Sequence, residues 1–562
     1  MELETRQDSG SSSPAQFRAV SRFLYWLGPA VIAIVIAFTQ AEWLNRNFPN
    51  YPPLRFDSAA YFARCLDNLR ALEIAGWPAI GNFVRRPDVP GSSALVGSGV
   101  LAMLLVGNSY TVVLAAVNAF WLTLLGVGAQ WQARSLGWKA SWPWPAAFVL
   151  SWPSVIGMAR EFRTELPLMA CTSLLTAALL SRRIWKDLPH TVVVSLLMIF
   201  CVMAKPVSAV LLIPLTVDFL LSRRQQDSLR NNVWPHGVTL FACACLIGLL
   251  LVPSILPLLG YYGAYGKSYE AYGQKLVSGD ALSSGLIGRV LYYPANLLST
   301  HLSESFLILQ SIVVVYSLLR IGLHSKTLRH TVARPLRLVF TYWGFGMVAL
   351  ALYGVRTPAG DFSFVAFVIP LLLVPWISIV SRFENRPADM MVFVLSVGLL
   401  LTSLGSAIKT PGAGWAGLPI HRVDRASSWG LEKVAETIQL EADNKSPVDV
   451  MVLASHTVIN YHTVRAEMLK TLSLEHAIGN TSKTLFYTPP TKDLSHPSVQ
   501  AATHLLVKSG EGGPAVSWIS EKAPQFYTLL KQEPGLGVEP MWASPLRLPD
   551  NSELMLYKKR LP

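Results

Sequence analysis

Long apolar runs recur along most of this 562-residue chain and restrict its fold more than any other feature. They include residues 23–41, 110–129, 237–259, 336–354, 362–380 and 390–407. A helix of roughly 20 residues crosses the core of a bilayer. Backbone polar groups leave water only within helices or closed barrels, and these runs lack the alternation of barrel strands. The sequence therefore predicts a polytopic α-helical membrane protein.

The charge distribution agrees with a membrane bundle. Charged residues make up only 14% of the chain, against roughly 25% in soluble domains. The formal net charge is +13, but the basic residues gather in short clusters between apolar runs, such as "SRRIWK" (181–186) and "RIGLHSKTLRHTVARPLR" (320–337). Clusters of this kind are typical of cytoplasmic loops. The positive charge therefore favours contact with membrane lipids and argues against a nucleic-acid partner.

The same bias predicts how the chain is threaded through the membrane. The five loops assigned to the cytoplasm hold fifteen Lys and Arg residues, and the loops between them hold seven. This topology requires segment 94–106 to enter and leave on one side, as a re-entrant or interfacial segment, and residues 191–221 to form two crossings that break at "KP" (205–206). We predict about eleven spanning helices in the inner cell membrane, with a cytoplasmic N-terminus and an extracytoplasmic C-terminus.

Composition divides the chain into three parts. The polar residues 1–20 predict a disordered cytoplasmic tail, and residues 21–408 a transmembrane catalytic domain with an external loop over 42–91. Beyond Ile408 long apolar runs stop, and residues 409–562 predict a small extracytoplasmic α/β domain. Its strand-like segments are 448–454, 503–509 and 552–559, and its helical segments are 429–442, 458–472 and 524–533.

Nothing in the sequence indicates a metal or a cofactor. The five cysteines include no CxxC pair, and most lie in or beside apolar runs. His456 and His462 are six residues apart, a spacing that does not place two ligands on one face of a helix. The C-terminal domain also lacks the nucleotide-binding, zinc-protease and serine-hydrolase motifs. We therefore expect it to support or recognise a molecule without performing chemistry.

Three segments on the predicted external face carry charges and prolines in a distinctive order. They are "DSAAYFARCLDNLRA" (57–71), "SWPSVIGMAREFRTELPLMACTSLL" (151–175) and "VMAKPVSAVLLIPLTVDFLL" (202–221). In this order they resemble the GT-C glycosyltransferases, which include protein O-mannosyltransferases and the lipid A aminoarabinose transferase. The resemblance implies a polyprenyl-phosphate sugar donor and a glycolipid, polysaccharide or protein acceptor. The first external loop has no DxD or Asp-Glu pair, which argues against the divalent-metal site of the oligosaccharyltransferase branch.

The first segment supplies the candidate general base. Asp57 matches the Asp of the family's first external loop, and partial desolvation near the membrane surface favours a carboxylate that accepts a proton. The alternative is that Asp57 caps a helix beginning at Ser58. Tyr61 follows one helical turn later, where it either lines the same site as a binding residue or anchors the helix at the interface.

The second segment supplies a cluster of charges, "REFRTE" (160–165). Arg160 and Arg163 suit the donor phosphate, because guanidinium groups bind phosphate with two parallel hydrogen bonds. Glu165, which matches the family's Thr-Glu pair, is the second candidate catalytic carboxylate. The alternative is an ion-pair network that only fixes the turn.

Two further basic residues are candidates for the donor phosphate. Lys205 lies between two apolar segments, where an unpaired charge is costly, so it either binds phosphate or extends to lipid headgroups. Arg356 begins "RTPAGDFSFVAFVIP" (356–370), where the family often has an Arg-Tyr pair. The loop 260–301 is rich in Tyr and Gly, which fits either closure over substrate or an interfacial belt.

The sequence thus predicts a membrane glycosyltransferase that acts on the extracytoplasmic face. The main alternative is a polytopic membrane transporter or lipid flippase. Transporters often have internal repeats and helices broken near the midplane. This chain has no convincing repeat, and its notable charges lie at one predicted rim. A polysaccharide polymerase or ligase and a membrane scaffold are further alternatives.

Overall fold

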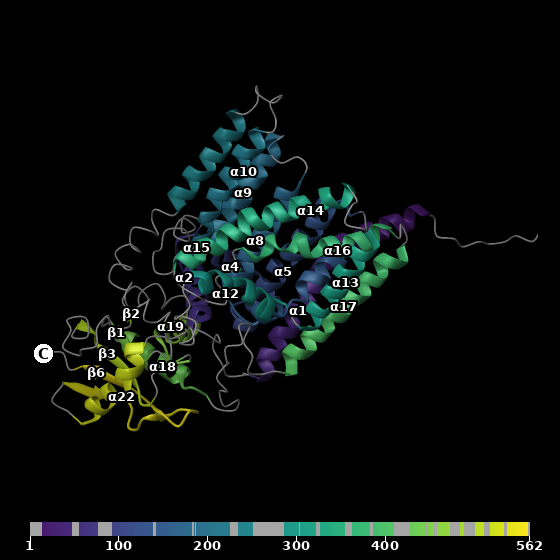
Figure 1. Cartoon of the computed structure of the whole chain (residues 1–562). Helices are drawn as coiled ribbons and strands as arrows, with labels where there is room; N and C mark the ends of the chain where they lie inside the picture. The colour runs from purple at the N-terminus through teal and green to yellow at the C-terminus, as the bar shows by residue number, and fades with distance from the viewer. Residues whose placement is uncertain are drawn as a thin grey trace, which may run out of the picture.

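The computed structural model is largely helical, with a small β-sheet near the C-terminus (Figure 1). It describes residues 14–47, 56–76, 93–138, 142–181, 187–224, 234–250, 286–302, 304–321, 326–353, 364–382, 386–409, 428–443, 448–454, 458–471, 484–487, 501–510, 517–532 and 537–559, with 185, 362 and 456.

Helices make up the described part of the bundle. They are α1 (Pro14–Asn47), α2 (Phe56–Ala75), α4 (Ser93–Val106), α5 (Tyr110–Ser135), α6 (Trp144–Leu150), α7 (Pro153–Met158), α8 (Glu165–Leu180), α9 (Leu188–Ala204), η2 (Pro206–Leu211), α10 (Leu212–Arg224), Trp234–Leu250, α12 (Leu286–Asn296), η5 (Leu297–His301), α13 (Glu304–Ile321), α14 (Lys326–Leu338), η6 (Val339–Gly344), α15 (Phe345–Tyr353), η8 (Val365–Phe367), α16 (Ile369–Arg382) and α17 (Arg386–Lys409).

Helix α1 begins earlier than predicted. Residues 14–20, assigned to a disordered tail, form its first turns, so that prediction is wrong for these residues. Pro14 is the first helical residue, a position where proline is favoured because its missing N–H would have no helical partner. Residues 1–13 lie outside the described residues.

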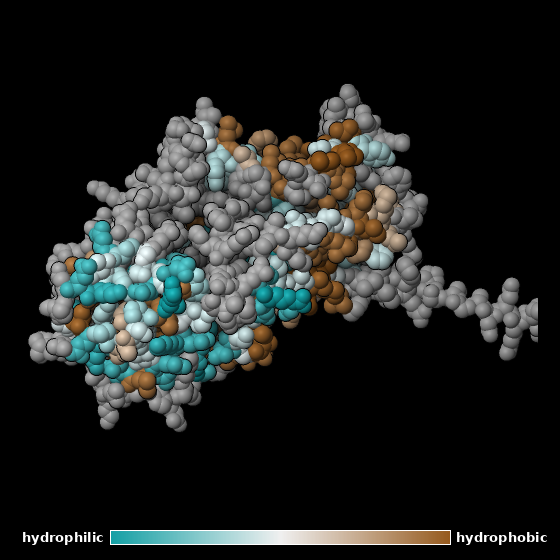
Figure 2. Space-filling view, turned by 90° about the horizontal axis from the view of Figure 1, so that it is seen from below, coloured by the Kyte–Doolittle hydropathy of each residue, from teal (hydrophilic) through white to brown (hydrophobic). Residues whose placement is uncertain are grey.

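The helices are apolar enough for a membrane protein. Within the described ranges, three are long and apolar enough to cross a bilayer: Leu27–Asn47, Tyr110–Ser135 and Ala388–Ala407. Shorter apolar helices accompany them, so the predicted count of about eleven spans stays a prediction. Figure 2 shows hydrophobic residues gathered on one side of the face in view, and hydrophilic residues on the side where Figure 1 places the C-terminal sheet.

Helix α5 packs against α1 and α8 at the centre of the bundle. A Cβ atom added to Gly128 in α5 would lie 2.5 Å from Ser173 Oγ in α8, so only glycine permits this approach. One turn later, Gln132 Nε2 donates a hydrogen bond of 2.9 Å to the backbone oxygen of Ser173. The close contact and the buried hydrogen bond fix α8 relative to α5.

Segment 94–106 forms α4, a single short helix. Its 14 residues are about 21 Å long, which is less than the roughly 30 Å of a bilayer core. Helix α4 packs against α2, α5 and α9. A helix of this length fits the predicted re-entrant or interfacial segment, although its depth in the membrane stays a prediction.

The predicted break at Lys205 is confirmed. Helix α9 ends at Ala204, and Lys205 adopts an extended backbone with φ −157° and ψ 122°. Residues before proline avoid helical geometry because the proline ring crowds them, and Pro206 begins the separate helical turn η2.

The C-terminal part contains a mixed sheet with strand order β2-β1-β3-β6-β4, and β5 also pairs with β6. Strands β1, β2 and β3 are parallel, whereas β6 runs antiparallel to its neighbours. The strands are β1 (Val448–Leu453), β2 (Thr484–Tyr487), β3 (His504–Lys508), β4 (Val538–Pro540), β5 (Leu546–Arg547) and β6 (Glu553–Lys559), and the helices are α18 (Leu431–Asp443), α19 (Tyr461–Thr471) and α22 (Ser517–Gln532).

This arrangement agrees with the predicted alternation of strands and helices. Helix α22 differs, because it begins at Ser517 and contains Pro524, the residue at which the helix was predicted to start. Helix α19 packs along α2 and so joins the sheet to the helical bundle (Figure 1).

Candidate functional site

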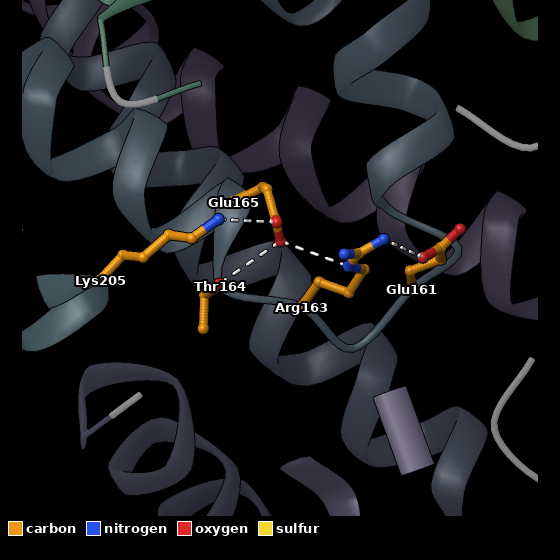
Figure 3. A network of polar contacts seen from close by, with 5 residues as sticks. All are labelled: Glu161, Arg163, Thr164, Glu165 and Lys205. Atoms are coloured by element: carbon orange, nitrogen blue, oxygen red, sulfur yellow. Dashed lines mark hydrogen bonds and ion pairs between the residues drawn. The ribbon is translucent and has the colours of Figure 1, made fainter. Parts of the chain in front are cut away.

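Four charged side chains meet where α8 begins and α9 ends (Figure 3). We call Glu161, Arg163, Glu165 and Lys205 the charged cluster. Lys205 Nζ donates a hydrogen bond of 3.1 Å to Glu165 Oε1. Arg163 Nε forms an ion pair of 3.4 Å with Glu165 Oε2, and Arg163 Nη1 donates to Glu161 Oε2 at 3.4 Å. The cluster contains two anions and two cations and is formally neutral.

Local sequence explains this convergence. Glu165 is the first residue of α8, where a carboxylate interacts favourably with the helix dipole. Pro167 lies in the same first turn, where proline is tolerated because these N–H groups lack helical partners. At the other end, the break before Pro206 leaves Lys205 at the terminus of α9. Two helix termini therefore bring opposite charges together.

Burial differs across the charged cluster. The side chain of Glu165 is 3% exposed and that of Lys205 is 30% exposed. Glu165 Oε2 also accepts a 3.4 Å hydrogen bond from Thr164 Oγ1, so both carboxylate oxygens are engaged. The Lys205 ammonium has three N–H donors, and its more exposed position makes it the cation that an entering anion meets first. The arrangement is a buried carboxylate that holds a more accessible cation.

The turn that precedes α8 is locked to its surroundings. Asn118 Nδ2 in α5 donates a hydrogen bond of 2.9 Å to the backbone oxygen of Ala159. The Phe162 ring meets Phe62 of α2 edge to face, with ring centroids 6.1 Å apart. A Cβ atom added to Gly99 of α4 would lie 2.8 Å from Phe162 Cζ. Helices α2, α4 and α5 therefore hold the charged turn in one position.

Helix α2, which carries Asp57 and Tyr61, packs against this turn through Phe62. Asp57 is the second residue of α2, and its backbone is helical. The helix begins at Phe56, one residue before Asp57. Tyr61 is partly buried and packs against the core. The contact of Phe62 with the charged turn is five residues, or about 7.5 Å along the helix axis, from Asp57.

Arg160 has partners outside the charged cluster. Its Nε donates a hydrogen bond of 2.6 Å to Gln40 Oε1 in α1, and its Nη2 donates one of 2.5 Å to the backbone oxygen of Ala407 in α17. The guanidinium also lies 3.7 Å from the centre of the Trp43 ring. Arg160 is 2% exposed and ties the turn to two helices.

The structure thus brings together Arg163, Glu165 and Lys205, and sets α2 against the turn that carries the first two. Arg356 and most of the loop 260–301, up to residue 285, lie outside the described residues.

Sequence reasoning missed a buried pair that joins α7 to η5. His301 Nδ1 lies 2.9 Å from Ser154 Oγ in α7, although the residues are 147 positions apart. The His301 ring also meets the edge of Phe362. Ser154 belongs to segment 151–175 and His301 to the loop 260–301, but nothing in either segment indicates that the two residues meet.

The charged cluster contains two carboxylates and no histidine or cysteine. Within the described residues, no three His, Cys, Asp or Glu side chains are grouped so that they could hold a metal ion. In the charged cluster each carboxylate faces a guanidinium or ammonium group.

Comparison with known proteins identifies the fold. No protein family and no curated protein sequence matches the chain. The crystal structure of ArnT from Cupriavidus metallidurans bound to undecaprenyl phosphate aligns with a TM-score of 0.51 at 12% identity, over 97% of this chain and 98% of that one. ArnT in the apo state gives 0.47 at 11% identity over the same shares.

The archaeal oligosaccharyltransferase AglB from Archaeoglobus fulgidus, in complex with an inhibitory peptide and a dolichol-phosphate, gives a TM-score of 0.46 at 11% identity. That match covers 82% of this chain and 65% of AglB. The alignment with the lipid-bound ArnT structure extends over nearly the whole of both chains, bundle and sheet included. Together with its apolar helices, this likeness shows that the chain is a membrane protein with the GT-C fold.

Proposed function

We propose that this protein is a membrane glycosyltransferase that moves a sugar from a polyprenyl-phosphate donor to an acceptor on the extracytoplasmic face. The GT-C fold supports the proposal, and the ArnT structure with this fold holds undecaprenyl phosphate. The observation that carries it is the charged cluster, in which Lys205 is the most exposed member and α2 packs against the adjoining turn. This places a partly exposed cation beside the turn against which the helix that carries Asp57 packs.

The reaction needs a base and a site for the leaving phosphate. An acceptor hydroxyl or amine loses a proton to a carboxylate, and its oxygen or nitrogen forms a bond with the anomeric carbon of the sugar. The bond from that carbon to the phosphate oxygen breaks, and polyprenyl phosphate departs with the electron pair. Negative charge grows on the phosphate, so fixed cations there stabilise the transition state more than the ground state.

Asp57 is the proposed general base. Glu165 is less suited to that role, because Lys205 and Arg163 hold its two oxygens and a carboxylate stabilised by two cations accepts a proton poorly. We therefore assign Glu165 the positioning of Lys205 and Arg163. Tyr61, one turn after Asp57, is proposed to line the same site as a binding residue.

Lys205 and Arg163 are the proposed donor-phosphate ligands. Glu165 fixes one N–H of the Lys205 ammonium, and the remaining two are available to phosphate oxygens. Arg163 adds a guanidinium suited to phosphate. Arg160 is proposed to fix the turn through Gln40 and Ala407, and Arg356 is proposed as a further phosphate ligand.

Mass spectrometry of surface glycolipids and glycoproteins tests this function. Cells lacking the protein are complemented with the native chain, Asp57→Asn or Lys531→Met at matched membrane levels. Lys531 lies on the exposed surface of α22 and serves as the control for an altered charge. We expect a sugar-sized mass to disappear on deletion and to return with the native chain and Lys531→Met only.

Two outcomes would contradict the proposal. Full restoration by Asp57→Asn would exclude that residue as the base. An unchanged glycan profile after deletion would contradict the assignment as a transferase and favour that of a transporter or lipid flippase.

A further inference from the structure

An ion pair joins the C-terminal domain to the helix that carries Asp57. Arg465 Nη2 in α19 lies 2.9 Å from Asp67 Oδ2 in α2. The Arg465 side chain is 33% exposed and that of Asp67 is 14% exposed. Helix α19 packs along α2 at this point, between the sheet and the bundle (Figure 1).

Helix α2 is held by the bundle on the other side. Its Phe62 ring meets Tyr110 edge to face, with centroids 4.9 Å apart. Three residues later, Cys65 Sγ lies 3.6 Å from the backbone oxygen of Val96 in α4. Because each helical residue turns by about 100°, Asp67 lies about 160° around the axis from Cys65. The bundle and α19 therefore contact opposite faces of α2.

Position 57 falls between these two faces. It precedes Asp67 by ten residues and Cys65 by eight, which places it about 80° around the axis from each. Position 61 lies about 40° from Cys65, on the bundle side of the same flank, in agreement with the partial burial of Tyr61. A rotation of α2 about its axis would therefore move this flank relative to the charged cluster.

The N-terminus of α19 is built as a fixed support for Arg465. Asn460 Oδ1 accepts hydrogen bonds from the backbone N–H groups of His462 at 3.0 Å and Thr463 at 3.1 Å. Thr463 Oγ1 in turn donates a 2.6 Å hydrogen bond to the backbone oxygen of Val458. These buried bonds join the first turn of α19 to the segment that follows β1.

We propose that the Asp67–Arg465 pair is a positioning device through which the C-terminal domain sets the rotation of α2, and with it the place of Asp57 relative to the charged cluster. The inference rests on the proposed function. A partly exposed ion pair contributes only about 0.2–1 kcal/mol to stability, so its loss leaves the protein folded. A small misplacement of a reacting group, by contrast, lowers a rate by about tenfold to a hundredfold.

The test uses the full-length protein with four variants. Arg465→Gln and Asp67→Asn each break the pair, and the double variant Asp67→Arg with Arg465→Asp restores it in reverse. Lys470→Gln is the matched control, because it breaks the Lys470–Glu467 ion pair within the same helix α19. Sugar transfer is measured as an initial rate in isolated membranes, binding with undecaprenyl phosphate as the probe, and backbone motion by hydrogen exchange.

We expect Arg465→Gln and Asp67→Asn to lower the transfer rate at least about tenfold while binding of undecaprenyl phosphate stays unchanged. The rate of amide hydrogen exchange should rise in residues 56–75, whereas the rate in residues 110–135 should stay unchanged. The reversed pair should recover most of the rate, and Lys470→Gln should behave as the native chain. A merely structural role would lower rate, binding and thermal stability together.

Several results would overturn the inference. One is an unchanged transfer rate together with unchanged amide exchange in Arg465→Gln. Another is a transfer rate that falls in proportion to undecaprenyl phosphate binding. A third is a reversed pair that does not recover the transfer rate. The variant Asp57→Asn distinguishes failure of this inference from failure of the proposed function. If Asp57→Asn is inactive and Arg465→Gln is unimpaired, only the inference fails. If Asp57→Asn is fully active, the proposed base is wrong and the inference falls with it.

Discussion

Lys205 Nζ lies 3.1 Å from Glu165 Oε1, and this contact joins the end of α9 to the start of α8. The two residues are 40 positions apart and come from separate apolar helices. The lysine is the more exposed partner and the glutamate is buried. The carboxylate therefore acts as the inner support of a cation that faces outward, a geometry suited to binding an anion.

Replacement of Lys205 by methionine should weaken donor binding. A hydrogen bond between an ammonium and phosphate is worth about 1.5–3 kcal/mol, so the Kd for undecaprenyl phosphate should rise at least about tenfold. Lys205→Arg keeps the charge and should retain much of the affinity. Lys531→Met, on the exposed surface of α22, should bind as the native chain does. Equal binding by Lys205→Met and the native chain would remove Lys205 from the donor site.

Replacement of Glu165 by glutamine should destabilise the protein more than replacement of Lys205. Glu165→Gln removes the anion from two buried or partly buried ion pairs at once, which costs about 3 kcal/mol because the cations then lack a partner. Its melting temperature in detergent should fall accordingly.

The double variant of Glu165→Gln with Lys205→Met should recover part of this loss, since one unpaired cation is removed with the carboxylate. Arg46→Gln, which breaks the exposed Arg46–Glu42 pair of α1, is the control and should change the melting temperature little. Strict additivity of the two single changes would show that Glu165 and Lys205 do not interact.

Two glycines of α4 test the interlock of α2, α4 and the charged turn. A Cβ atom at Gly99 would lie 2.5 Å from Cys65 Sγ and 2.8 Å from Phe162 Cζ, whereas one at Gly97 meets no atom within 4 Å. Gly99→Ala should therefore destabilise the protein by about 1–3 kcal/mol through overpacking. Gly97→Ala should be neutral or stabilise it by up to about 1 kcal/mol, because alanine favours a helix.

Thermal unfolding of both variants in detergent measures this difference. Because the two positions share one helix and differ by two residues, their contrast isolates the packing at Gly99 from helix propensity. An equal melting temperature for the two variants would mean that α4 does not hold α2 against the turn.

The sequence predicts helices and strands better than it predicts contacts. The apolar runs and the break before Pro206 follow from local rules of hydrophobicity and backbone geometry, and the structure agrees with them. The partners of Arg160 do not follow from local rules. They come from α1 and α17, more than 100 residues away in either direction, and no spacing of residues in the sequence predicts these contacts.

The same limit applies to the charged turn. "REFRTE" predicts either a phosphate site or an ion-pair network, and the structure contains the network while leaving Lys205 accessible. The choice between the two depends on which side chains are buried, a property of the assembled helices. The joining of α2 to the C-terminal domain through Asp67 and Arg465 likewise depends on tertiary contacts.

Acidification should weaken the C-terminal domain through His504. Burial, with a smaller contribution from Lys558, lowers the pKa of His504 to about 4, although Glu441 acts in the opposite direction. Unfolding restores an ordinary pKa of about 6.5, so the unfolded chain binds the proton more readily and stability is lost as the pH falls from about 6.5 towards 4. With allowance for screening, the loss should be about 1–2 kcal/mol.

Urea unfolding followed at several pH values between 7 and 4 measures this loss, with His504→Gln as the comparison. Burial also lowers the pKa of His462 well below its usual range, so both chains should lose stability with acid, and the difference between them reports on His504. The native chain should lose more stability than His504→Gln over this interval, because glutamine binds no proton in either state. Parallel curves for the two chains would show that His504 does not carry the pH dependence.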